Sequence, residues 1–289
     1  MREMLESKIL VALERIANSL EILAPQPRSA ETNDTAAAFI WNPEGGFLSP
    51  VERVNRLDIK LLKGIDRSMS TLFDNTKRFA LGFPANNALL WGARGTGKSS
   101  LVKAVHGALL VEYPCLSLVE IHREDISTLT RLLPILKKDT KRRFILFCDD
   151  LSFEAADESY KSLKTLLEGG IEGRPQNVIF YATSNRRHLM SREIPEQTGD
   201  DAINSRETAE ERISLSDRFG LWLGFHNCDQ ETFLKIIDAY AEHFKLLENR
   251  KELHSKAIEW SVTRGARSGR VAWQFIQDIA GEQGKSLDI

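Results

Sequence analysis

The sequence predicts an α/β fold, with a parallel sheet built around a phosphate-binding loop and a small helical unit after it. Apolar strand-like runs alternate with helical patterns between residues 87 and 225, which is typical of a parallel sheet covered on both faces. A glycine-rich loop separates the first of these runs from the helical pattern that follows. Residues 229–284 contain helical patterns and no strand pattern, which indicates a separate helical unit.

The composition is that of a globular chain without membrane segments. The chain has 289 residues, 42% of them hydrophobic and 28% charged, and its formal net charge is −2. This near-neutral charge gives no general reason to expect nucleic acid or a membrane surface as a partner. No run approaches the roughly 20 apolar residues that span a bilayer. The separated cysteines Cys115, Cys148 and Cys228 lie in apolar runs and are typical of buried thiols, so we expect a cytoplasmic protein.

We expect four parts along the chain. Residues 1–24 have apolar side chains at helical spacing and predict an N-terminal helix. Residues 25–38 are rich in Pro, Thr and Ala and predict a linker. The α/β core takes residues 39–228 and a helical lid takes residues 229–289. The first helix either docks on a partner or a second copy, or packs on its own domain, and the sequence leaves both open.

The individual elements follow from the apolar pattern. An apolar entry segment at 39–48 precedes helical patterns at 57–62 and 69–79. Strands are expected at five apolar runs: 87–91, 115–121, 144–148, 178–182 and 221–225. Helical patterns between and after them lie at 100–110, 124–137, 158–168, 231–244, 253–263 and 268–279. The polar, aperiodic stretch 191–213 predicts a long insertion, either without fixed structure or with a regulatory or partner-binding role.

The glycine-rich loop fits the pattern G-x-x-x-x-G-K-[ST], which binds nucleotide phosphates. It consists of Gly92, Ala93, Arg94, Gly95, Thr96, Gly97, Lys98 and Ser99, with Ser100 in the helix that follows. Glycines let backbone N–H groups point at phosphate oxygens, and the helix N-terminus adds roughly half a positive charge. Lys98 would reach the β- and γ-phosphates, and the Ser99 hydroxyl would ligate Mg²⁺.

Two acids follow the third predicted strand. The apolar run Phe144–Cys148 ends in Asp149 and Asp150. Mg²⁺ beside such a loop needs a carboxylate at the tip of a neighbouring strand, and Asp149 fits this role through a water. Hydrolysis needs a group that orients or deprotonates the attacking water, and Asp150 is the next residue to project there. Glu154 is the second candidate for this base.

Further polar residues lie where later strands end or begin. Asn185 ends the fourth predicted strand, where its side chain would sit beside the γ-phosphate. Arg218 comes just before the fifth strand. Arg267 and Arg270 lie in the basic run 264–270 of the helical unit. The strand–helix unit between the phosphate loop and the two acids is typical of the additional-strand branch of P-loop ATPases.

These elements, in this order, resemble the AAA+ ATPases over about residues 55–284. The strings GARGTGKSS, LFCDDLSFE, ATSNRRHL and LSDRFGLWL resemble a bacterial family described only as ATP-binding proteins. The resemblance implies that the loop is Walker A and that Asp149 and Asp150 form Walker B. Asp-Asp replaces the commoner Asp-Glu at this place, which leaves the assignment of the base open.

The resemblance also implies roles for residues outside the Walker motifs. Asn185 would be sensor 1, Arg218 the arginine finger, and Ile65 part of the segment that packs against adenine. The sensor-2 arginine would be Arg267 or Arg270, and the G-x-R spacing favours Arg267. Such a finger serves the neighbouring subunit, so the resemblance implies a homo-oligomer with shared ATP sites.

The function implied is Mg²⁺-dependent ATP hydrolysis coupled to remodelling of a macromolecular partner, an unidentified protein. The alternative is an ATP-dependent assembly switch or loader with little turnover of its own, acting with nucleic acid. Nucleic acid is possible as a partner but not favoured, because the basic stretches lack interleaved aromatic residues for base stacking. A small-molecule kinase is not favoured, since no motif for a second substrate is evident.

Overall fold

A computed structural model describes residues 14–15, 19, 36–153, 159–168, 174–187, 189, 217–246 and 249–287. Most of the expected N-terminal helix, the expected insertion at 191–213 and the candidate base Glu154 lie outside these residues. Within the described part, no helix is long and apolar enough to cross a membrane.

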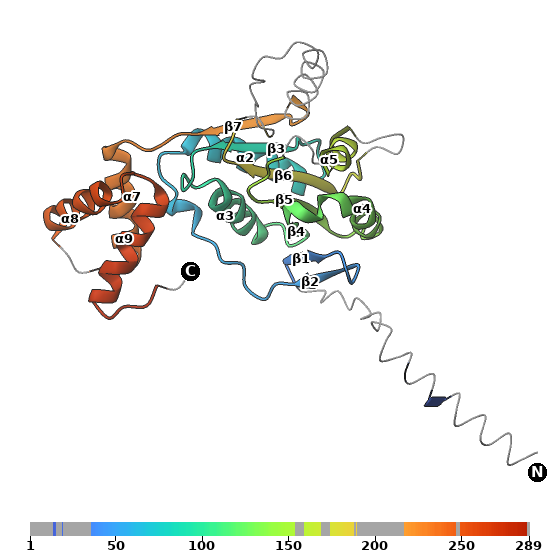
Figure 1. Ribbon diagram of the computed structural model, residues 1–289, viewed down its shortest axis with the longest axis horizontal. Helices are drawn as coiled ribbons and strands as arrows, with labels where there is room; N and C mark the ends of the chain where they lie inside the picture. The colour runs from blue at the N-terminus through green and yellow to red at the C-terminus, as the bar shows by residue number, and fades with distance from the viewer. Residues whose placement is uncertain are drawn as a thin grey trace, which may run out of the picture.

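A seven-stranded sheet forms the centre of the molecule, in the order β2-β1-β4-β5-β6-β3-β7 (Figure 1). Its strands are β1 (Ala38–Asn42), β2 (Phe47–Pro50), β3 (Ala88–Gly92), β4 (Leu116–Glu120), β5 (Arg143–Cys148), β6 (Val178–Ser184) and β7 (Leu221–Phe225). Every pair of neighbours is parallel except β1 and β2. The predicted parallel α/β fold is confirmed. In the sheet, β6 separates the strand of the phosphate loop, β3, from the strand of the two acids, β5.

The hairpin of β1 and β2 is a feature that the sequence reasoning missed. The segment 39–48, expected only as an apolar entry segment, forms this hairpin and extends the sheet beyond β4. Gly46 closes the turn at a φ of 66°, and its N–H donates to the Asn42 carbonyl at 2.9 Å. The strand already begins at Ala38, the last residue of the expected linker. Trp41 fixes the hairpin to the domain, because its Nε1 donates to Thr128 Oγ1 at 2.8 Å.

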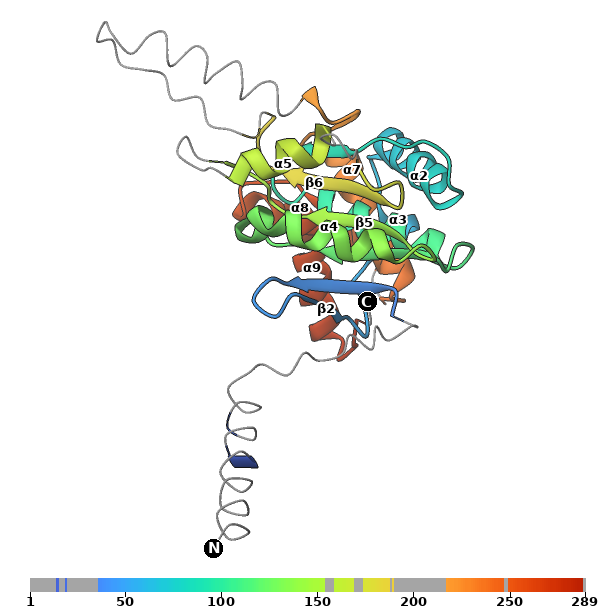
Figure 2. The ribbon, with the colours of Figure 1, turned by 90° about the vertical axis from the view of Figure 1, so that its right-hand side faces the viewer.

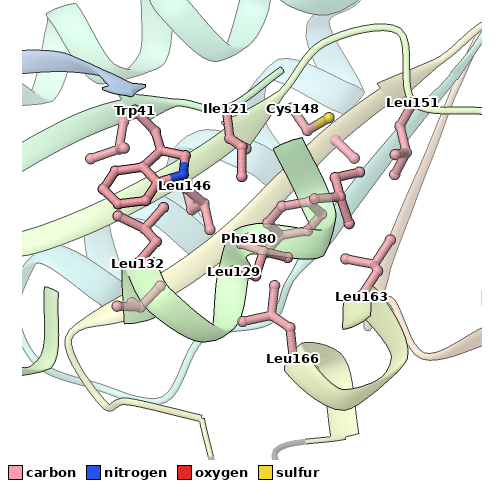
Figure 3. Close-up of a cluster of buried hydrophobic side chains, with 14 of the residues drawn as sticks. Trp41, Ile121, Leu129, Leu132, Leu146, Cys148, Leu151, Leu163, Leu166 and Phe180 are labelled. Carbon is pink, nitrogen blue, oxygen red and sulfur yellow. The ribbon is translucent and has the colours of Figure 1, made fainter. Parts of the chain in front are cut away.

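Helices cover both faces of the sheet. They are α2 (Asp66–Ala80) and α3 (Lys98–Leu110) on one face and α4 (Leu129–Lys138) and α5 (Ser159–Glu168) on the other (Figure 2). On the α4 and α5 side, Trp41, Leu129, Leu163 and Phe180 belong to one continuous buried cluster (Figure 3). Because both faces of the sheet are buried, the central strands are nearly continuous apolar runs and do not alternate between polar and apolar residues. These runs are the pattern from which the strands were predicted.

Two short 3₁₀ helices, η1 (Ile59–Leu61) and η2 (Arg123–Thr128), precede α2 and α4. The helix expected at 57–62 is therefore wrong in extent, and only the single turn η1 forms. The chain leaves it because Leu62 has extended backbone at a ψ of 104° and Gly64 has a φ of 76°.

The C-terminal helices α7 (Gln230–His243), α8 (Arg250–Thr263) and α9 (Gly269–Glu282) group beside the sheet (Figure 1). Side chains of Asp229, Asn249 and Ser268 accept hydrogen bonds from the first turns and so define where these helices begin. The helices share a buried cluster that includes Phe233 and Phe275. Leu61 of η1 joins this cluster, so the segment before α2 connects the core with the helical lid.

The cysteines differ from the expectation in part. Cys148 is buried, as expected, but Cys115 and Cys228 are only half-buried, and all three are free thiols. The reason is position: Cys115 precedes β4 and Cys228 lies beyond β7, where the chain has left the sheet.

Candidate functional site

A cleft of about 1200 Å³ opens at the carboxyl ends of β3, β5, β6 and β7, between the sheet and the helical lid. The glycine-rich loop forms its floor, and the segment before α2 forms one wall. Side chains from α7 and α9 line the lid side. Ligands commonly bind in such a crevice at the carboxyl ends of parallel strands, so this cleft is the candidate site.

The loop has a backbone that requires glycine. Gly92 has a φ of 140°, and a Cβ there would lie 1.9 Å from the Phe225 carbonyl oxygen of β7. Gly95 and Gly97 have φ values of 76° and 91°, in the left-handed region, and Gly97 directly precedes α3. Successive amides in such conformations form a concave anion-binding surface at a helix N-terminus.

Lys98 points back into this loop. Its Nζ donates to the carbonyl oxygens of Gly92 at 2.9 Å and Ala93 at 2.7 Å, and to Asn185 Oδ1 at 3.1 Å. Burial lowers the pKa of Lys98, while Asp149 and Asp150 oppose this shift and the cations Arg270 and Arg94 add to it. The lysine is therefore buried within the phosphate loop, and its ammonium group is held by three oxygen acceptors.

The two acids after β5 face the loop. The Ser99 hydroxyl donates to Asp149 Oδ1 at 2.6 Å. The Asn185 side-chain amide donates to Asp150 Oδ1 at 2.5 Å, and the same Asn185 accepts from Lys98. The structure thus brings together five residues that the sequence singled out, from the ends of three different strands.

Ser99 and Asp149 suit a magnesium ion. A hydroxyl oxygen and a carboxylate oxygen are the hard ligands that Mg²⁺ prefers, and both residues line the cleft. Their oxygens already lie 2.6 Å apart beside the phosphate loop, so one ion could contact the hydroxyl directly and the carboxylate through a water. The residues present therefore fit the expected ion.

Thr183 is a site residue that sequence reasoning missed. It lies in β6 two residues before Asn185, is 1% exposed and lines the cleft. Its hydroxyl donates to Asp149 Oδ1 and accepts the Asp150 N–H at 2.9 Å. Two residues along a strand point to the same side, so the position of Asn185 was the available signal.

Arg218 does not belong to the cleft of its own chain. It lies just before β7, and its Nη2 and Nε contact Glu168 Oε1, in the last position of α5, at 2.5 and 2.6 Å. Among the described residues that line the cleft, Arg218 is absent.

Of the two candidate lid arginines, Arg270 lines the cleft and Arg267 is not among the described residues that do. The Arg270 N–H donates to the Gly95 carbonyl at 3.2 Å, which ties the start of α9 to the phosphate loop. A Cβ on Gly95 would lie 2.9 Å from the Arg270 Cβ, so only glycine allows this approach. The Nε of Arg267 is buried without a hydrogen-bond partner among the described residues.

Ile65 lines the cleft from the segment before α2, and its Cδ1 would lie 3.8 Å from a Cβ built on Gly97 of the loop. Ile236, Tyr240 and Trp273 of the lid line the same cleft. Gly64 packs closely on α7, because a Cβ there would lie 2.3 Å from Thr232 Cγ2. The apolar side chains among these lining residues can contact a flat apolar group, while the loop suits phosphates.

A family model and solved structures match this chain. A family model described as "Protein of unknown function (DUF815)" matches residues 34–283. A structure of the Aeropyrum pernix Orc1 protein in complex with DNA is 16% identical, with a TM-score of 0.55, and the match covers 77% of this chain and 61% of that chain. The Thermotoga maritima RuvB Holliday junction branch migration motor is 13% identical, with a TM-score of 0.46, covering 76% and 71% of the two chains. A search of curated proteins finds no match. The match to the Orc1 structure shows that the two chains share a fold.

Proposed function

We propose that this chain, which belongs to the DUF815 family, is an ATPase that binds ATP with Mg²⁺ in the cleft and hydrolyses it. The observation that carries the proposal is the convergence of Lys98, Ser99, Asp149, Asp150 and Asn185 in one hydrogen-bonded group. If Asp149 and Asp150 were only solvent-exposed acids at a strand end, nothing would require the buried Lys98. Nor would anything require the Asn185 amide, which connects Asp150 to that lysine.

ATP binding would use the phosphate loop and the apolar side chains that line the cleft. The loop amides and Lys98 would hold the phosphates, with Lys98 exchanging the Gly92 and Ala93 carbonyls for phosphate oxygens. The adenine would lie beside Ile65, where apolar side chains line the cleft. Mg²⁺, when bound at Ser99 and Asp149, would neutralise charge on the β- and γ-phosphates.

Hydrolysis needs a water held in line with the terminal phosphate. The Asp150 carboxylate is exposed to the cleft and can orient this water or accept its proton. Asn185 contacts both Lys98 and Asp150, so its amide can hold the water between the phosphate and the acid. These roles use side chains of this chain alone.

We assign the lid arginine to Arg270 in place of Arg267. Its place on the cleft wall and its contact with the loop at Gly95 support this choice. A cation there would contact phosphate oxygens from the lid side, so ATP would draw α9 toward the core. Hydrolysis would then change the angle between lid and core, which is the movement that could remodel a protein partner.

Arg218 would act on the ATP of a neighbouring chain in a homo-oligomer. This proposal is supported by its absence from its own cleft among the described lining residues. A second candidate function, an ATP-dependent assembly switch or loader with little turnover alone, is favoured by the contact of Arg218 with Glu168. The switch would turn over only when assembly on a partner, such as nucleic acid or protein, moves Arg218 away from Glu168.

Two substitutions test the ATPase proposal by separating binding from hydrolysis. Lys98→Ala should weaken the affinity for a fluorescent ATP analogue by about 100-fold, because a charge-assisted contact of 1.5–3 kcal/mol is lost along with the loop geometry. Asp150→Asn should bind the analogue within about 3-fold of wild type but lose about 10²–10⁴-fold in phosphate release.

The matched control is Asp74→Asn, which changes an exposed aspartate of α2 outside the cleft and should retain wild-type behaviour. Unchanged affinity in Lys98→Ala would contradict ATP binding in this cleft. Unchanged phosphate release in Asp150→Asn would place the base elsewhere, with Glu154 the next residue to substitute.

A further inference from the structure

Thr183 connects the ends of two neighbouring strands at the site. Regular pairing of β5 with β6 ends at Cys148 and Ala182. Beyond this pair, the Thr183 carbonyl accepts the Leu151 N–H at 2.7 Å, and the Thr183 hydroxyl accepts the Asp150 N–H at 2.9 Å. The same hydroxyl donates to Asp149 Oδ1. One buried side chain therefore contacts both acids of the site.

The backbone of Asp150 is the first feature that needs this support. Asp150 has a φ of 51°, in the left-handed region that residues other than glycine rarely adopt. Such a conformation persists when surrounding contacts fix it. The Asp150 N–H has two acceptors on the described residues, Thr183 Oγ1 and, at 3.2 Å, Asp149 Oδ1. The hydroxyl thus helps to hold the base in a strained turn.

The Asp149 carboxylate is the second feature. Its Oδ1 accepts from the hydroxyls of both Ser99 and Thr183, which approach from α3 and β6. Together with the Asp150 N–H, these two hydroxyls give Oδ1 three donors, which fix the rotation of the carboxylate relative to the loop. Groups that orient a metal ligand in this way commonly contribute 10–100-fold to metal affinity or activity.

We propose that Thr183 is a positioning residue for ATP hydrolysis, whose hydroxyl orients Asp149 toward Mg²⁺ and holds Asp150 in its left-handed turn. The inference rests on the proposed ATPase function. Thr183 borders the cleft but is only 1% exposed, and its hydroxyl is engaged with the Asp149 carboxylate and the Asp150 N–H, so we assign it a role through the two acids. It also links the end of β6, the strand that precedes Asn185, to the two acids.

The test compares Thr183→Val, which removes the hydroxyl at nearly constant shape, with Thr183→Ser, which keeps it. The matched control is Thr76→Val. It removes another buried hydroxyl, one that contacts Tyr181 of the same strand but none of the acids. All three are compared with the full wild-type chain.

The first measurement is amide hydrogen exchange by NMR in the nucleotide-free chain. Thr183→Val should speed exchange of the Asp150 amide by about 10-fold, because that amide loses an acceptor. The Leu151 amide is an internal control, since its acceptor is the Thr183 carbonyl, which valine retains. Thr183→Ser and Thr76→Val should leave both amides at wild-type rates.

The second measurement is Mn²⁺ affinity by EPR with a non-hydrolysable ATP analogue, followed by steady-state hydrolysis with Mg²⁺. Thr183→Val should lower Mn²⁺ affinity and kcat by about 10–100-fold, while KM for ATP stays within about 3-fold. Thr183→Ser should restore most of both losses, and Thr76→Val should show neither.

The inference would be overturned if Thr183→Val kept the Mn²⁺ affinity and kcat of the wild type. It would also be overturned if Thr183→Ser lost as much Mn²⁺ affinity and kcat as Thr183→Val. An unchanged Asp150 exchange rate would overturn it without reference to ATP. Failure of the proposed function looks different: the wild-type chain itself would bind no Mn²⁺–nucleotide and release no phosphate, while the exchange rates would still decide whether the hydroxyl holds Asp150.

Discussion

The buried histidine of α3 should make the free energy of unfolding depend on pH. His106 is 0% exposed, and burial lowers its pKa to about 4, with the nearby charge of Arg56 adding to the shift and the backbone of Leu116 opposing it. The ordinary histidine pKa is 6.5. The folded chain therefore keeps this ring neutral at pH values where the unfolded chain protonates it.

The sign and size of the effect follow from proton linkage. Between pH 6.5 and about 4 the unfolded state binds the extra proton, so stability falls as the pH falls through this window. Below about pH 4 the folded state also binds it, and the loss levels off. A shift from 6.5 to about 4 corresponds to about 3 kcal/mol at 1.36 kcal/mol per pH unit.

The assay is chemical unfolding of the wild type and His106→Leu at several values from pH 7 to pH 4. Taking the difference between the two proteins removes the contribution of other titrating groups. The difference should shift by about 3 kcal/mol in favour of the variant as the pH falls. An NMR titration of the His106 ring measures the pKa directly. A difference that stays constant with pH, or a ring that titrates near its ordinary value, would refute the reasoning.

Three further predictions concern the cleft. Gly92→Ala should lower the free energy of unfolding by about 2 kcal/mol or more, because its Cβ would lie 1.9 Å from a backbone oxygen of β7; Gly281→Ala, with nothing within 4 Å, should not. Arg270→Ala should weaken ATP-analogue binding by about 10-fold or more in a fluorescence titration, since a charged contact is lost. Arg218→Ala should lose about 10³-fold or more in phosphate release. Mixing it with inactive Lys98→Ala should restore part of the activity, and no recovery on mixing would argue against shared sites.

The strands around the site were predictable because strands buried on both faces are continuous apolar runs in the sequence. A central parallel strand covered on both faces reads as one apolar run, as in Phe144–Cys148. Carboxyl ends of such strands meet at one edge, so polar residues that follow them converge. This is why Asp149, Asp150 and Asn185 could be grouped with Lys98 from the sequence alone.

Other features depend on contacts between distant parts of the chain. The hairpin of β1 and β2 is short and lies at the sheet edge, where the apolar pattern is weak. The available signal was the turn Asn42–Gly46 between the apolar segments Phe39–Trp41 and Phe47–Leu48. The role of Thr183 depends on β6 lying beside β5, an order that sequence does not give.

The arginines show the same limit. Motif spacing favoured Arg267 as the sensor-2 arginine. The residues that α9 presents to the cleft depend on where this helix begins, which is just after its cap Ser268. As a result, Arg270 is the arginine that lines the cleft. The partner of Arg218 is Glu168, 50 residues earlier, and only the packing of α5 brings the two together. Counting residues cannot give the rotation of a helix or the neighbours of a surface side chain.

The central claim is that the cleft between core and lid hydrolyses ATP. The most direct measurement is phosphate release from ATP by the purified full chain, with and without Mg²⁺, across a range of protein concentrations. We predict Mg²⁺-dependent release that rises per chain with protein concentration and falls by about 100-fold or more in Lys98→Ala. Equal release by wild type and Lys98→Ala, or no Mg²⁺-dependent release by wild type at any concentration, would contradict the claim.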